Sequence, residues 1–168
     1  NYIFYMFYLK KYDSYNQTKE LRIFFKKTLT ETYNYFLFIE LLYKSKDYIF
    51  MVTDKTQLIA AVTGMEEHRN TGTIAMLGVL KEYRKHGLAK FLVKLILNSF
   101  YNKGITTVYV DTNESNIPAL KLYKSIGFVI INYFERYYTD CSPAFRLKIE
   151  LKEEFDMKND IYFYLLNN

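Results

Sequence analysis

A short basic segment with one glycine, residues 84–89, has the composition of an anion-binding turn. It reads Arg-Lys-His-Gly-Leu-Ala and joins the apolar run Met76–Leu80 to an amphipathic helix. Free backbone N–H groups at a helix N-terminus, together with three potential cations, suit a phosphate or pyrophosphate. Gly87 would let the backbone approach the anion, and the small Ala89 would leave the first helical turn open. The spacing is neither the G-x-G-x-x-G dinucleotide pattern nor a Walker loop.

A second block, residues 111–128, follows the helix that the basic turn begins. It contains the end of a strand, then Asn116, a helix with Tyr123, and Gly127-Phe128. With Arg-x-x-Gly-x-Ala in residues 84–89, this block resembles the coenzyme A loop and second motif of the GCN5-related N-acetyltransferase (GNAT) family. A capped helix without a ligand is the alternative for the first motif alone. Two motifs in family order favour the family.

The resemblance implies acetyl-coenzyme A as the cosubstrate and no metal ion. Backbone N–H groups of the strand before the turn would receive the thioester oxygen, and the turn would hold the pyrophosphate. The cofactor-binding residues that it implies are Leu77, Val79, Arg84, Lys85, His86, Gly87, Leu88, Ala89, Asn116 and Tyr123.

Two side chains of the second block are candidates for proton transfer. Tyr123 stands where the family has the tyrosine that protonates the departing sulfur, and a hydroxyl with a pKa of about 10 can protonate a thiolate. A core tyrosine is the alternative in a chain with 18 tyrosines. Asp111 stands where relatives carry Glu or His, and it would accept the proton of the α-ammonium through water. An exposed strand-end carboxylate is the alternative for Asp111, and a helix cap is the alternative, or an additional role, for Asn116.

Within the family, the likeness is strongest to the catalytic subunits of NatC-type protein N-terminal acetyltransferases. The residues that carry this likeness are 65–70, 76–93, 116–128, 134–138 with 144–147, and more weakly 30–33. It implies transfer of acetyl to the α-amino group of proteins that begin with Met and a bulky apolar residue. It also implies auxiliary subunits and the ribosome as possible partners. A lysine or small-amine acetyltransferase, and a non-catalytic scaffold that binds coenzyme A, are the alternatives.

The acceptor side of the predicted site consists of two tyrosine-containing loops. The residues that match loops closing over a peptide N-terminus in these enzymes are Glu31, Tyr33, Tyr137 and Tyr138. Tyrosine hydroxyls can bond a peptide backbone while their rings line an apolar pocket. A tyrosine-rich surface hairpin is the alternative, and Thr32 replaces a proline of the family's first loop.

The amino-acid composition predicts a cytoplasmic protein with one hydrophobic core. The 168 residues are half apolar and 19% aromatic, which suffices for one domain. The net charge is +5, with basic and acidic residues interspersed, so we expect no specific nucleic-acid partner. No apolar run reaches transmembrane length, so we expect no membrane contact. The single cysteine, Cys141, fits a reducing compartment.

We predict an α/β protein with the GNAT fold: a central mixed, twisted sheet of about seven strands flanked by about four helices. The domain would cover residues 1–152, and residues 153–168 would form a tail or an added element. The predicted strands are 2–10, 48–53, 58–66, 73–80, 106–112, 128–138 and 144–151. The predicted helices are 17–29, 33–43, 87–101 and 117–126.

Overall fold

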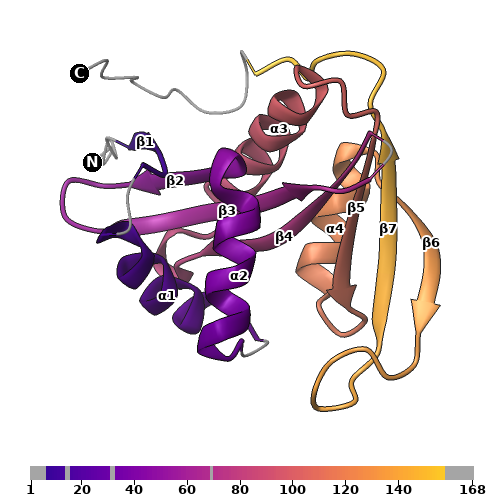
Figure 1. Cartoon of the computed structure of the whole chain (residues 1–168), viewed down its shortest axis with the longest axis horizontal. Coiled ribbons are helices and arrows are strands. Elements are labelled where there is room, and N and C mark those ends of the chain that lie inside the picture. Colours follow the sequence, from indigo (N-terminus) through magenta and orange to yellow (C-terminus); the bar gives the residue numbers. More distant parts are fainter. Residues whose placement is uncertain (1–6, 14–15, 31–32, 69, 158–168) are drawn as a thin grey trace.

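The computed structural model describes residues 7–13, 16–30, 33–68 and 70–157, and these contain seven strands and four α-helices (Figure 1). The strands are β1 (Tyr8–Lys11), β2 (Ile49–Thr53), β3 (Leu58–Glu66), β4 (Thr71–Val79), β5 (Thr107–Asn113), β6 (Val129–Phe134) and β7 (Ala144–Glu150). The helices are α1 (Asn16–Thr28), α2 (Tyr35–Ser45), α3 (Leu88–Tyr101) and α4 (Ile117–Ile126), with short 3-10 helices η1 (Lys46–Tyr48) and η2 (Lys81–Tyr83). The predicted mixed α/β sheet is confirmed.

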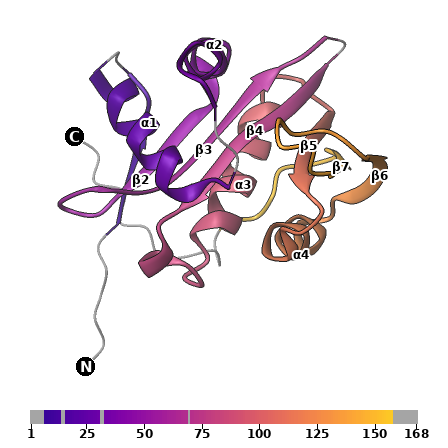
Figure 2. The same ribbon diagram turned by 90° about the horizontal axis from the view of Figure 1, so that it is seen from below.

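The sheet has the strand order β1-β2-β3-β4-β5-β7-β6. Helices α1 and α2 cover one face, and α3 and α4 cover the other (Figures 1 and 2). The neighbours β4 and β5 run parallel, because α3 carries the chain back across the sheet between them, and every other neighbouring pair is antiparallel. This single parallel pair places the C-terminal ends of β4 and β5 at the same edge of the molecule.

The central strands are buried on both faces. Along β2, Ile49 and Met51 join the core beneath α1 and α2, whereas Phe50 and Val52 join the core beneath α3. Side chains alternate between the two faces of a strand, so a strand between two helical layers reads as a continuous apolar run, as β2 does.

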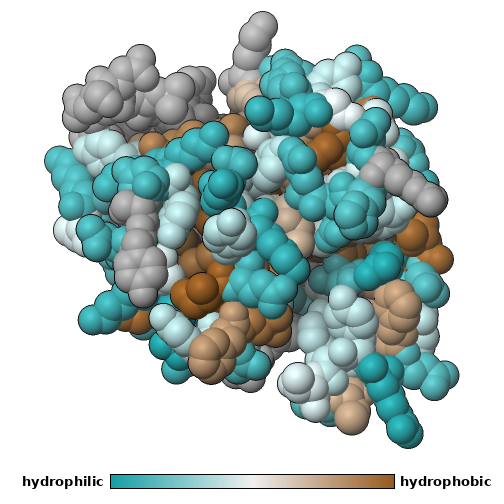
Figure 3. Space-filling model, viewed as in Figure 1, coloured by the Kyte–Doolittle hydropathy of each residue, from teal (hydrophilic) through white to brown (hydrophobic). Residues whose placement is uncertain are grey.

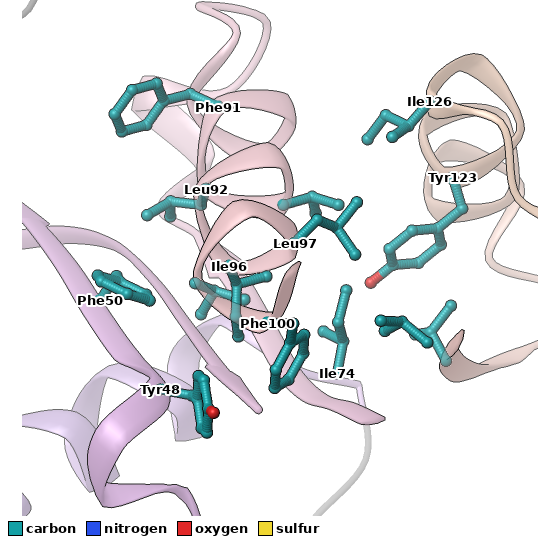
Figure 4. Packing of buried hydrophobic residues seen from close by; sticks show 14 of the residues in the cluster. Tyr48, Phe50, Ile74, Phe91, Leu92, Ile96, Leu97, Phe100, Tyr123 and Ile126 are labelled. Carbon is teal, nitrogen blue, oxygen red and sulfur yellow. The ribbon is translucent and has the colours of Figure 1, made fainter. Parts of the chain in front are cut away.

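Helix α3 packs its apolar face against the sheet and against α4. Leu88, Leu92 and Ile96 recur every four residues and, with Phe100, are at most 1% exposed. Figure 4 shows Leu92, Ile96 and Phe100 of this row, with Leu97 of the same helix facing Tyr123 of α4. Helix α2 is covered on one side only: Phe36 and Tyr43 are 83% and 75% exposed. On the same side of the molecule, Figure 3 shows polar and apolar side chains interspersed.

Several predicted boundaries differ from the structure. The last strand before the acceptor loop was predicted as 128–138, but β6 ends at Phe134, so Tyr137 and Tyr138 lie in the loop before β7. Helix α2 begins two residues later than predicted, because the Asn34 side chain accepts from the Leu37 N–H and caps it. β4 begins at Thr71, two residues before the start of the predicted strand 73–80. The start of the predicted strand 2–10 lies outside the described residues.

The described part of the predicted tail, residues 153–157, packs beside α3. The Asn98 side chain donates to the Phe155 carbonyl at 3.0 Å and accepts from the Phe155 N–H at 2.7 Å. Phe155 and Met157 also pack against the core. This segment is therefore held against the domain at least to residue 157.

Candidate active site

The predicted site residues gather where β4 and β5 separate. Residues Thr71–Ile74 of β4 pair with Thr107–Val110 of β5. Both strands continue beyond that point, but they no longer pair with each other. A cavity of about 80 Å³ opens in the gap. Its lining residues are Leu29, Tyr33, Ile74, Ala75, Met76, Leu77, Val110, Asp111, Thr112, Asn116, Ala119, Tyr123 and Tyr138. Six predicted site residues from separate parts of the sequence thus line one cavity: Tyr33, Leu77, Asp111, Asn116, Tyr123 and Tyr138.

The separated end of β4 presents backbone donors to this gap. The Leu80 N–H bonds to the Ile59 carbonyl on β3 at 2.9 Å. Since successive N–H groups of a strand point to opposite edges, those of Leu77 and Val79 point toward the open side. Here a thioester carbonyl could accept a hydrogen bond, as predicted for these two residues.

The basic turn forms one end of a larger groove that adjoins the cavity. The groove has a volume of about 580 Å³, within the range of roughly 300–1,000 Å³ usual for small-molecule sites. Residues that line it are Thr28, Leu29, Thr30, Leu77, Gly78, Val79, Tyr83, Arg84, Lys85, Gly87, Leu88, Ala89, Lys90, Asn116, Pro118, Ala119 and Leu122. Every predicted cofactor residue except His86 and Tyr123 is in this set, and Tyr123 lies in the adjoining cavity.

The backbone of the turn is shaped for anion binding. Lys85 and Gly87 both have positive φ, 65° and 80°, a conformation that favours glycine. Gly87 is the N-cap of α3 and supplies no side-chain acceptor, and the first turn carries no acidic residue. The first N–H groups of α3 are therefore left for a ligand, and the partial positive charge of the helix end favours an anion there.

A contact that the sequence did not reveal anchors the turn. The Tyr83 hydroxyl donates to Asp54 Oδ2 at 2.5 Å, from η2 to the β2–β3 turn. Desolvation acts to raise the pKa of Asp54, but hydrogen bonds from Tyr83, Thr56 and Gln57 outweigh it and lower that pKa to about 2. Arg84 Nε also donates to the Val79 carbonyl at 3.2 Å. Tyr83 and Asp54 are 29 positions apart in the sequence, so no local sequence pattern indicates their hydrogen bond.

Tyr123 projects from α4 into the core beside the cavity. Its ring makes an edge contact with Phe128 at 5.3 Å between centroids, and the side chain is 4% exposed. Figure 4 shows its hydroxyl between Leu97 and Ile74. The described residues offer that hydroxyl no hydrogen-bond partner. Burial raises the pKa of Tyr123, so the hydroxyl is protonated at neutral pH and can donate.

Asn116 caps α4, which is the alternative or additional role expected for it from the sequence. Its Oδ1 accepts from the Ala119 N–H at 3.2 Å. The residue also lines both the cavity and the groove. The two roles are compatible, because the side-chain NH₂ group can still donate to a bound molecule.

Asp111 is a partly buried, ion-paired carboxylate within β5. Arg146 of β7 donates to it twice, from Nε to Oδ1 at 2.8 Å and from Nη2 to Oδ2 at 2.7 Å. The Tyr137 hydroxyl also donates to Oδ2. Asp111 is 13% exposed, so the alternative of an exposed strand-end carboxylate is wrong. The sequence analysis did not identify Arg146 as a site residue.

The tyrosines of the acceptor loops come from two separate segments of the chain that border the cavity. Tyr33 precedes α2, and Tyr138 lies in the β6–β7 loop; both line the cavity. Tyr137 stacks on Phe134 at 5.4 Å between ring centroids. Burial, followed by the bond to Asp111, raises the pKa of Tyr137 to about 12. Glu31 lies outside the described residues.

Other chemistries receive no support within the described ranges. No three His, Cys, Asp or Glu side chains there lie close enough together to hold a metal ion. No helix there has the length and apolar character needed to cross a membrane. Cys141 is exposed in the β6–β7 loop.

Comparisons with known proteins agree with this geometry. The chain matches the acetyltransferase (GNAT) family over residues 13–128. It is 30% identical to N-alpha-acetyltransferase 30 of Schizosaccharomyces pombe over 137 residues, 79% of this chain and 91% of that protein. It is 35% identical to N-alpha-acetyltransferase 30 of Saccharomyces cerevisiae over 96 residues, 55% of this chain and 54% of that protein. A chain in the crystal structure of the NatC complex bound to Gag peptide and CoA matches with a TM-score of 0.80 and 25% identity, over 87% of this chain and 99% of that chain.

Proposed function

The chain belongs to the acetyltransferase (GNAT) family, and we propose that it transfers the acetyl group of acetyl-coenzyme A to the α-amino group at a protein N-terminus. The observation that carries the proposal is the continuous hollow at the separated ends of β4 and β5. The groove with the uncapped helix N-terminus shares lining residues with the cavity, and tyrosines of two loops also line the cavity. A donor and an acceptor can therefore meet between the strands.

The donor side would hold acetyl-coenzyme A through its pyrophosphate and its thioester. The first N–H groups of α3, with Arg84 and Lys85, would bind the pyrophosphate. The Leu77 and Val79 N–H groups would receive the thioester oxygen and stabilise the charge that develops on it during attack. The Asn116 amide would contact the pantetheine arm.

Proton transfer would complete the reaction. The α-ammonium of a peptide has a pKa of about 7.7–8, so a useful fraction of the free amine exists near neutral pH. The free amine attacks the thioester carbon, and Tyr123 would give its hydroxyl proton to the sulfur as the C–S bond breaks. The nitrogen loses a proton as the amide forms, and Asp111 is the predicted acceptor of that proton, through water. The two bonds from Arg146 to Asp111 argue instead for a structural role, in which case water would carry the proton to solvent.

The acceptor preference would be NatC-like, for Met followed by a bulky apolar residue. Similarity to N-alpha-acetyltransferase 30 of two yeasts supports this finer proposal. Tyr33 and Tyr138 would contact the peptide end, and Glu31 is a predicted peptide-binding residue from the sequence alone. Apolar pockets discriminate by about 1–3 kcal/mol for each methylene-scale change, so a large second side chain should be favoured clearly over a small one.

One peptide that begins Met-Leu and also contains a lysine tests the proposal. The expected product carries acetyl on the α-amine and none on the lysine, as read by fragmentation mass spectrometry. Predominant lysine acetylation would instead support the lysine acetyltransferase alternative. Equal rates for Met-Leu and Ser-Ala peptides would retain N-terminal acetylation but reject the NatC-like preference.

The assay should be run with the protein alone and with candidate auxiliary subunits. The related structure named above is that of a complex, so an acceptor loop could need a partner chain to become active. Binding of acetyl-coenzyme A without turnover under both conditions would support the scaffold alternative.

A further inference from the structure

Arg146 of β7 contacts residues of two other strands on the acceptor side of the site. It lies directly opposite Asp111 in the antiparallel register of β5 and β7. Its guanidinium donates to both carboxylate oxygens of Asp111 and also lies over the Phe134 ring of β6, 5.1 Å from the centroid. The planar guanidinium group suits both contacts, because its N–H groups can bond a carboxylate in its plane while its face stacks on an aromatic ring.

The same cluster continues into the β6–β7 loop through Tyr137. The Tyr137 hydroxyl donates to Asp111, and its ring stacks on Phe134. The adjacent Tyr138 ring meets that of Tyr137 edge-on at 5.0 Å between centroids. Arg146 is thus connected, through Asp111 and Phe134, to the residue next to the tyrosine that lines the cavity.

The far arm of the loop is attached separately to β5. Asn113 Nδ2 donates to Ser142 Oγ at 2.9 Å, and the Tyr137 and Tyr138 N–H groups donate to the Ser142 carbonyl at 3.1 and 3.2 Å. The Tyr137 side chain in the near arm is joined to β5 through Asp111. Without Arg146, the Asp111 carboxylate would be a mostly buried, uncompensated charge and would draw in water, so Tyr137 would lose a fixed acceptor.

We propose that Arg146 is a positioning residue for the peptide acceptor: by holding Asp111 and Phe134, it fixes Tyr137 and thereby sets Tyr138 at the cavity opening. In this arrangement Asp111 is an anchor for the loop and accepts no proton from the amine. The inference rests on the proposed function for its acceptor and deepens the assignment of that side of the site.

The test compares Arg146→Gln and Arg146→Lys with Asp111→Asn. We expect Arg146→Gln to raise KM for a Met-Leu peptide by about tenfold or more, with KM for acetyl-coenzyme A within twofold of the parent and kcat reduced less than KM rises. Arg146→Lys keeps one charged bond and should recover part of the loss. Lys148→Gln is the matched control, since it removes another cation from β7 whose partner, Glu150, is remote from the loop.

A second measurement reads the loop without any acceptor. Hydrogen exchange at the Tyr137 and Tyr138 amides, and the alkylation rate of the single cysteine, Cys141, should both increase in Arg146→Gln and stay unchanged in Lys148→Gln. The double variant Asp111→Asn with Arg146→Gln should resemble Arg146→Gln, because both changes remove the same link. A melting curve for each variant separates these effects from global unfolding.

The outcomes separate this inference from the proposed function. If Asp111→Asn lowers kcat by about a hundredfold without affecting loop exchange, and Arg146→Gln does not reproduce this, Asp111 is a base and the inference fails. If Arg146→Gln changes neither peptide KM nor loop exchange, the inference also fails, whatever the parent acetylates. If the parent acetylates no α-amine but Arg146→Gln loosens the loop, the proposed function fails and the positioning role remains.

Discussion

Replacing Tyr123 by phenylalanine tests the proton donor while leaving the packing of α4 intact. The ring contact with Phe128 does not involve the hydroxyl. Because that hydroxyl has no hydrogen-bond partner among the described residues, its removal leaves no described group unpaired. We therefore expect the free energy of unfolding to change by less than about 1 kcal/mol.

The expected loss in kcat is between about tenfold and a thousandfold. General acid catalysis contributes roughly 10²–10⁴-fold when the donor's pKa suits the reaction. Burial raises the pKa of Tyr123 further above that of a thiol, which weakens the driving force for proton transfer and lowers the expected contribution. The loss corresponds to about 1.4–4 kcal/mol of transition-state stabilisation, with binding of acetyl-coenzyme A retained.

The assay is single-turnover acetylation of a Met-Leu peptide, followed by mass spectrometry. Colorimetric thiol detection is unsuitable without a blank, because Cys141 is exposed. Tyr101→Phe is the matched control: it removes a hydroxyl from α3 that donates only to the Lys152 carbonyl, at 3.3 Å. An unchanged single-turnover rate in Tyr123→Phe would refute the reasoning and leave Tyr123 as a packing residue.

Three further predictions concern the turn and the core. Acetyl-coenzyme A at a hundredfold excess over Kd should add about 2.7 kcal/mol of stability and so raise the melting temperature. Replacing Arg84 and Gly87 together by Ala should abolish this rise, and a retained rise would contradict the anion site. Asp54, with its pKa lowered to about 2, should contribute stability above its unfolded pKa of about 3.9 and lose it as pH falls toward 2; acid unfolding curves of Asp54→Asn should therefore lack this component. A Cβ at Gly64 would lie 2.8 Å from the Phe100 ring, so Gly64→Ala should destabilise the fold by about 1–3 kcal/mol in urea, and an unchanged midpoint would contradict that packing.

Local patterns in the sequence predicted the elements because each pattern has a local cause. The apolar spacing in residues 87–101 matches the buried face of α3, and Gly87 begins that helix with the left-handed backbone expected of glycine. The strand boundary at 134 was missed because Tyr137 and Tyr138 resume the aromatic pattern after the charged pair Glu135-Arg136. In the structure a turn follows Phe134, although Tyr137 and Tyr138 have high strand propensity.

Contacts between distant segments could not be predicted in the same way. The pairing of Asp111 with Arg146 depends on the register of β5 against β7, and the two residues are 35 positions apart. A one-residue shift would place Arg146 on the other face of the sheet. The Tyr83–Asp54 hydrogen bond likewise joins residues that are distant in the sequence and meet only in the fold. The sequence motifs indicated which residues form the candidate site, whereas the contacts that hold its loops required the fold.

The residues around the cavity favour direct attack of the amine on the thioester over an acyl-enzyme. A covalent route needs a nucleophile with an adjacent base, and the described residues that line the cavity include no Cys, Ser, His or Lys. Apart from tyrosines, Thr112 supplies the one hydroxyl among them, and it is 5% exposed. The nearby Asp111 carboxylate is bonded by Arg146 and Tyr137. Both substrates must then be bound together, which fits a donor groove beside α3 that shares lining residues with a cavity lined by Tyr33 and Tyr138 of the acceptor loops.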